Sequence, residues 1–102
     1  MAIHVIETGA LQDFAAGGPV MLPLAEAGQA RALLLNLEAG QSVTPCRMSA
    51  AVLYFVVTGR GRLHVGEEQA ELQAGSLAVV PAGALRHLSA GERMRVLAVQ
   101  IP

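Results

Sequence analysis

Apolar residues in this chain come in short runs that end at turn residues. The stretch from Ala51 to Thr58 contains Val, Tyr, Phe, Val and Val, a composition typical of a β-strand. Between Arg62 and Val65, polar and apolar residues alternate, as expected when one face of a strand is buried. The apolar runs Leu77–Val80 and Met94–Ile101 predict two more strands, and the turn signals are Gly59-Arg60-Gly61, Gly66-Glu67-Glu68, Gly75 and Pro81-Ala82-Gly83. Short strands at such intervals predict a β-sandwich or barrel.

Two segments contain residues that favour a helix. Gln29–Leu37 is rich in Ala and Leu, which locally favour a helix, although local propensity is a weak guide. Ala10–Ala16 could form one or two helical turns. No long amphipathic helix competes with the β pattern, so the predicted class is all-β.

Composition narrows the kind of protein. The length of 102 residues predicts one domain, residues 1–102. An apolar fraction of 53% with only 15% charged residues is high for so short a chain, which predicts a homodimer or, alternatively, an oversized apolar cavity. A net charge of −1 with two Phe and one Tyr argues against nucleic-acid binding. The single Cys forms no intramolecular disulfide.

Targeting signals are missing from the sequence pattern. The N-terminus has no basic region followed by an apolar stretch, as a signal peptide would. The longest uninterrupted apolar run, Ala50–Val57, is far shorter than the roughly 20 residues that span a bilayer. We therefore expect a cytoplasmic protein that does not associate with membranes.

Two spacings of glycine and proline point to a known family. Gly40 is followed after five residues by Cys46, and Gly75 is followed after five residues by Pro81-Ala82-Gly83. With these spacings, the sequence from about residue 26 to residue 100 resembles a small single-domain cupin. The resemblance implies a double-stranded β-helix, which is a jelly-roll barrel, usually dimeric, and it makes the ambiguous segment Gln29–Leu37 a strand.

The resemblance also implies where a metal would be bound. Most cupins hold a divalent metal with two His, a Glu and a third His, whose positions here are occupied by Cys46, Met48, Val52 and Arg86. Val52 has no donor atom, and a guanidinium stays protonated and cannot ligate a metal. We therefore expect no metal cofactor.

His87, next to Arg86, opens an alternative. Side chains in a strand alternate between its two faces. If Arg86 points inward, Leu88 and Ala90 also point inward, whereas if His87 points inward, Ser89 does. The first register buries the apolar residues better.

If His87 did point inward, it could join a soft metal site. Cys46 and Met48 share one face if they lie in a strand, and that face should be the barrel interior. Thiolate and thioether donors favour Cu(I), so these two residues with His87 form an alternative copper site. The simpler interpretation is that Cys46 and Met48 fill the core.

Arg86 and Tyr54 supply the polar groups of the expected interior. A buried guanidinium needs a partner, which could be a ligand carboxylate, Glu38, Glu92 or solvent. Tyr54 shares the parity of Val52 and Val56 and should aim its hydroxyl into the cavity.

These residues predict a metal-free barrel that binds a small, mostly apolar molecule, with a carboxylate as one option, in a sensing or regulatory role. The predicted ligand-binding residues are Cys46, Met48, Val52, Tyr54, Val56 and Arg86. Pockets of this kind are mostly apolar with a few polar anchors. The alternatives are a metal-dependent oxygenase or isomerase, the copper site, and a dimeric interaction module without a ligand. Whether the protein is an enzyme stays open, and the missing ligand set favours a binding protein.

Overall fold

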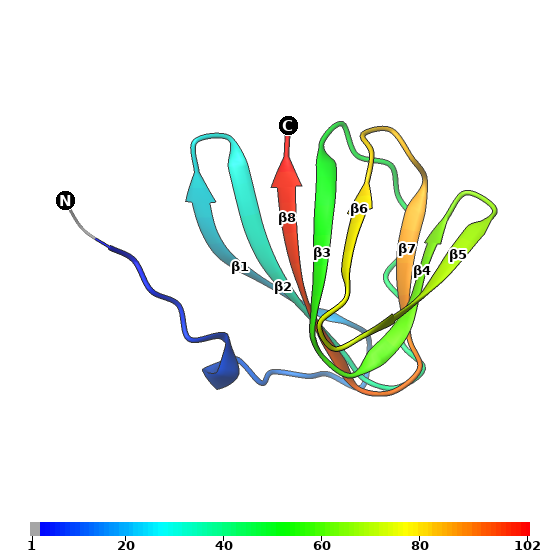
Figure 1. Ribbon diagram of the computed structural model, residues 1–102. Helices are drawn as coiled ribbons and strands as arrows, with labels where there is room; N and C mark the ends of the chain where they lie inside the picture. Colours follow the sequence, from blue (N-terminus) through cyan, green and yellow to red (C-terminus); the bar gives the residue numbers. More distant parts are fainter. Residues whose placement is uncertain (1–2) are drawn as a thin grey trace.

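The computed structural model describes residues 3–102 as two antiparallel sheets that form a double-stranded β-helix (Figure 1). The elements are a 3-10 helix η1 (Thr8–Ala10) and the strands β1 (Val20–Ala27), β2 (Ala30–Leu37), β3 (Ala51–Thr58), β4 (Arg60–Val65), β5 (Glu68–Gln73), β6 (Leu77–Val80), β7 (Arg86–Ala90) and β8 (Met94–Ile101). The five-stranded sheet has the order β1-β2-β8-β3-β6, and the three-stranded sheet has the order β5-β4-β7. The strands converge at one end, here called the closed end, and splay at the other, the open end (Figure 1).

The strands predicted from the sequence pattern are confirmed. Ala51–Thr58, Leu77–Val80 and Met94–Ile101 have the predicted bounds, and Gln29–Leu37 is a strand despite its Ala and Leu content. Its backbone pairs with β1 on one side and with β8 on the other. Hydrogen bonding along both edges outweighs the local helix preference. The possible helix at Ala10–Ala16 is replaced by the single 3-10 turn η1.

The core lies between the two sheets and is tightest at the closed end. Val56, Met94 and Val96 are fully buried there. A Cβ on Gly61 would overlap the carbonyl oxygen of Ser89 and would lie 2.7 Å from the sulfur of Met94. Only glycine lets the two sheets approach so closely at this point.

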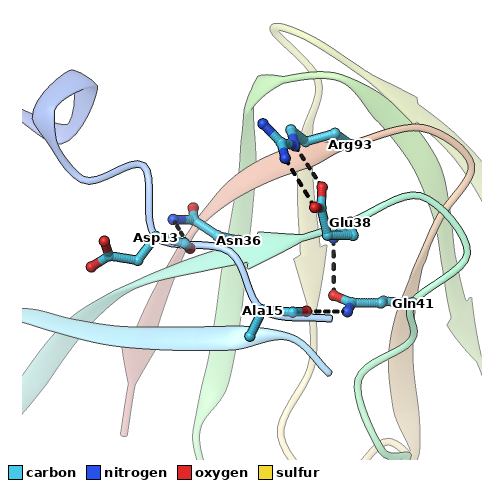
Figure 2. Close-up of polar contacts among 6 residues, drawn as sticks. All are labelled: Asp13, Ala15, Asn36, Glu38, Gln41 and Arg93. Atoms are coloured by element: carbon cyan, nitrogen blue, oxygen red, sulfur yellow. Dashed lines mark hydrogen bonds and ion pairs between the residues drawn. The ribbon is translucent and has the colours of Figure 1, made fainter. Parts of the chain in front are cut away.

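The N-terminal segment crosses the outside of the five-stranded sheet. The Asn36 side-chain amide donates to the carbonyl oxygen of Leu11 at 2.9 Å. It also donates to the carbonyl oxygen of Asp13 at 3.0 Å, and Gln41 donates to that of Ala15 at 2.6 Å (Figure 2). Arg95 donates to the carbonyl oxygens of Thr8 and Leu11. We call residues 8–15 the strap, and it explains why Asn36 and Arg95 are buried although they are polar.

Within residues 3–102, no helix has the length and apolar character needed to cross a membrane.

Candidate ligand-binding site

Arg86 begins β7 and points into the barrel at its open end. Only 1% of Arg86 is exposed, and the buried residues of this strand are Arg86, Leu88 and Ala90, so the predicted register is confirmed. Nε, Nη1 and Nη2 of the guanidinium are all buried, and none of them has a hydrogen-bond partner among the described residues. A buried charge without a partner is costly, so this position calls for an anionic group that the chain itself does not provide.

The carboxylates proposed as internal partners lie elsewhere. Glu38 forms a two-pronged ion pair with Arg93, with distances of 2.5 and 2.9 Å between the nitrogen and oxygen atoms (Figure 2). This bonding lowers the pKa of Glu38 and raises the pKa of Arg93. Glu92 lies 4.0 Å from Arg60. The guanidinium atoms are buried away from bulk solvent.

Tyr54 faces the interior from β3 in the opposite sheet. Its side chain is buried, as the parity with Val52 and Val56 predicted. Burial raises the pKa of the phenol, the positive charge of Arg86 opposes that rise, and the Cys46 thiol adds to it. The positive charge of Arg86 therefore reaches the Tyr54 phenol across the barrel.

Cys46 and Met48 differ from the prediction. They lie in the loop between β2 and β3, and Cys46 pairs with Arg86 only through an isolated bridge with two backbone hydrogen bonds of 3.0 Å. The expectation that both residues share the inward face of a strand was wrong, because no continuous strand forms there. Cys46 is exposed at the open end. Met48 is half-buried against the core, and its sulfur lies 3.9 Å from Nε2 of Gln100.

His87 points away from the barrel interior. Its ring stacks on that of His64, with 4.2 Å between ring centroids and 3° between the ring planes. Because Arg86 takes the inward position, the structure does not bring Cys46, Met48 and His87 together, and the alternative copper site is not assembled.

The metal usual in cupins is not matched by these residues either. Val52 is buried in the core without a donor atom, and Arg86 places a positive charge where the last ligand would be. Among residues 3–102, no group of three or more His, Cys, Asp or Glu side chains could hold a metal ion.

A groove lies between β6 and the hairpin of β4 and β5. Its volume is about 530 Å³, and its lining is Leu63, Val65, Glu68, Gln69, Ala70, Ala78 and Val79. Val65 is the cross-strand partner of Arg86, so the groove wall adjoins the strand that carries the guanidinium. The groove was not predicted from the sequence, although the alternation in Arg62–Val65 placed Leu63 and Val65 on one inward face.

The predicted lining residues therefore divide by depth. Arg86 at the start of β7 and Val52 near the start of β3, beside Val80, lie towards the open end, and Tyr54 is two residues further along β3. Val56 pairs with Val96 towards the closed end and forms part of the core packing.

Comparison with known proteins agrees with this architecture. The family model described as a cupin domain matches residues 33–100. The protein TT1209 from Thermus thermophilus superimposes with a TM-score of 0.89 at 22% identity, over 98% of both chains. An RmlC-like cupin from Desulfovibrio desulfuricans gives a TM-score of 0.85 at 20% identity, over 97% of this chain and 98% of that one.

A salicylate 1,2-dioxygenase variant from Pseudoaminobacter salicylatoxidans gives a TM-score of 0.79 at 18% identity, over 84% of this chain and 27% of that one. No curated protein matches the sequence. The family match spans most of the strands, and the chain therefore belongs to the cupin family.

Proposed function

We propose that the barrel binds, without a metal, a small and mostly apolar molecule whose carboxylate pairs with Arg86. The observation that carries this proposal is the buried guanidinium, whose three nitrogen atoms have no partner among the described residues. A carboxylate accepts two parallel hydrogen bonds from a guanidinium, which satisfies charge and geometry together. We propose a sensing or regulatory role for this binding.

Tyr54 supports the same ligand class. A tyrosine phenol is protonated at neutral pH, and burial raises the pKa of Tyr54 further above 10, so its hydroxyl can donate a hydrogen bond to an anion. The groove of about 530 Å³ has the size of ordinary ligand pockets, and its lining is mostly apolar, with Glu68 and Gln69 as the polar residues. The ligand would therefore place its carboxylate at Arg86 and its apolar part along Leu63, Val65 and Ala78.

The backbone of Arg86 offers a way to report occupancy. It is bonded in both directions to Cys46, in the exposed loop at the open end. A ligand that fixes Arg86 would also order this loop, so a partner that contacts the loop could sense the bound state.

Metal-dependent oxygenase chemistry is not part of this proposal. The salicylate dioxygenase is similar to this chain in fold alone, and Val52 and Arg86 cannot supply the missing ligands.

A ligand screen with matched acids and amides tests the proposal. Tyr54 is the only Tyr and the chain has no Trp, so its fluorescence reports on the barrel interior without interference. Cyclohexanecarboxylate, hexanoate and salicylate are compared with the corresponding amides by thermal shift, and the first two also by Tyr54 fluorescence. We expect the acids to raise the melting temperature and the neutral amides to have little effect.

Two variants assign the effect to Arg86. Arg86→Met keeps the length of the side chain and removes its charge, and the affinity for the acids should fall about 10- to 100-fold with the loss of a charge-assisted pair. Arg31→Met removes an exposed arginine paired with Glu26 on the other sheet and should bind like the original protein. Equal effects of acids and amides, or acid binding that survives in Arg86→Met, would remove Arg86 from the site.

A further inference from the structure

We propose that Cys46 is a nucleophile at the entrance of the Arg86 site, and that the protein binds covalently those carboxylates that bear an electrophilic carbon. This step rests on the proposed function, because it keeps the carboxylate at Arg86 and adds a reaction at the neighbouring thiol. The ligand class thereby narrows from carboxylates in general to carboxylates that can alkylate a thiol.

Cys46 lies directly opposite Arg86 in an antiparallel bridge. Each residue donates its backbone N–H to the carbonyl oxygen of the other, in both cases at 3.0 Å. Residues paired in this way have their side chains on the same face, with Cβ atoms roughly 5 Å apart. The thiol and the inward-pointing guanidinium therefore start from neighbouring positions on one side of the bridge.

The thiol lies where solvent meets the barrel interior. Cys46 is exposed, although a free Cys is among the most buried residue types, so core packing does not account for it. It still acts on a group inside the barrel: burial raises the pKa of the Tyr54 phenol, the charge of Arg86 lowers it, and Cys46 raises it. An acid that reaches Arg86 from the open end therefore passes the thiol.

The loop that carries Cys46 is anchored on both sides of this residue. Before it, the N–H of Val43 donates to the carbonyl oxygen of Leu88 at 2.9 Å. After it, the carbonyl oxygen of Met48 accepts from the N–H of Gly83 at 2.8 Å. A nucleophile held in place beside a bound reactant needs to lose little freedom before it reacts. The anchored loop therefore favours reaction with a ligand that Arg86 holds.

The proposed reaction is an alkylation that needs no oxidant or reductant. Arg86 pairs with the carboxylate, and the Cys46 thiolate forms a sulfur–carbon bond to the electrophilic carbon. The bond from that carbon to its leaving group breaks, the leaving group departs with the electron pair, and the thiol proton goes to solvent. A free Cys is only roughly a few per cent thiolate at neutral pH, but this form is intrinsically very nucleophilic. Selectivity for acids then comes from the position in which Arg86 holds them.

Iodoacetate and iodoacetamide test the reaction, because both alkylate thiols and only iodoacetate is a carboxylate. Intact-mass spectrometry follows each rate, and peptide mapping assigns the adduct to Cys46, the only Cys of the chain. The measured quantity is the rate with iodoacetate divided by the rate with iodoacetamide. We expect this ratio to be about 10- to 100-fold higher in the folded protein than in the urea-unfolded chain, as one charge-assisted pair would produce.

Two arginine variants assign the preference. Arg86→Met should lower the ratio to that of the unfolded chain. Arg47→Met is the matched control, because Arg47 follows Cys46 directly but is exposed and donates to the carbonyl oxygen of Gly83 at 3.1 Å. It should keep the ratio of the original protein. In the original protein, cyclohexanecarboxylate should slow the reaction with iodoacetate, and the corresponding amide should not.

The outcomes separate this reaction from the binding proposal. If cyclohexanecarboxylate binds through Arg86 but folded and unfolded chains give the same ratio, the covalent step is wrong and the binding site stands. A high ratio that Arg47→Met abolishes and Arg86→Met preserves would also overturn the reaction, because surface charge would then explain it. If neither acid binding nor acid-selective alkylation depends on Arg86, the proposed function itself fails.

Discussion

Arg86 occupies the position of the last metal-binding histidine of most cupins, and this one difference in residue type changes what the barrel interior could bind. A hydrophobic side chain at this buried position would pack among Leu88, Val65 and Tyr54 without an electrostatic penalty. The guanidinium instead keeps a desolvated charge without a partner among residues 3–102. Residues that destabilise a protein in this way are typical of binding sites, where ligand contacts offset the cost.

This leads to a prediction about the ligand-free protein. Arg86→Met should raise the free energy of unfolding by about 1–4 kcal/mol, because it replaces an unpaired buried ion with an apolar side chain of similar length. Urea denaturation without added acids measures the change. Arg31→Met is the control and should change stability by less than about 0.5 kcal/mol, since Arg31 is exposed. Marked destabilisation by Arg86→Met would mean that the chain itself satisfies the guanidinium.

At the scale of elements, the pairing of β4 with β7 determines what each face presents. Register places Val65 opposite Arg86 on the inside and His64 opposite His87 on the outside. A shift by one residue would exchange these faces and bring His87 into the barrel. The apolar residues Leu63 and Leu88, which are paired and buried, fix the observed register.

The stacked histidines predict a pH effect on stability. Burial lowers the pKa of His87 below its ordinary value of 6.5, and the charge of His64 lowers it further. The unfolded chain therefore binds a proton at residue 87 more readily than the folded chain does, so this contribution to stability is present above pH 6.5 and is lost as the pH falls through the lowered pKa. We expect denaturation midpoints to decrease between about pH 7 and pH 5.

Variants of the pair isolate this effect. His64→Gln removes the repulsive charge and should make the decrease shallower, and His87→Gln should remove its contribution altogether. His4→Gln is the control, because His4 is exposed near the N-terminus. An identical pH profile for His87→Gln and the original protein would contradict the prediction.

For the whole molecule, the strap decides how much of the outer sheet face stays open. It covers Asn36 and Arg95, whereas Leu77 and Val79 on the outer face of the same sheet stay exposed.

Removal of the Asn36 amide should release the strap. Asn36→Ala eliminates two hydrogen bonds to the strap and should cost about 1–3 kcal/mol, because buried carbonyl groups lose their donor. Hydrogen exchange of residues 8–15 should accelerate more than exchange in β3 and β8. Gln12→Ala is the control, because it removes only an exposed local bond to the carbonyl oxygen of Gly9. Unchanged exchange in Asn36→Ala would show that other contacts hold the strap.

The strands and the inward position of Arg86 could be predicted from the sequence, whereas Arg60 and Gly61, expected in a turn, begin strand β4. Turn residues and alternation specify strands locally, and burial of Leu88 and Ala90 specifies the face that Arg86 shares. The position of Cys46 could not be predicted, because a strand was assumed where only one bridge forms. Asn36 is the single polar residue in the run Ala32–Leu37, and it could have indicated that another segment of the chain, the strap, covers this strand.

By itself the sequence determined the all-β class, the family resemblance and the loss of metal donors, because these depend on residue type and spacing. Only the tertiary structure decided that Arg86 has no internal partner among the described residues, that His87 stacks on His64, and that Leu77 and Val79 stay exposed on the outer sheet face. These properties arise from contacts between residues far apart in the chain, and no local pattern encodes which surfaces meet.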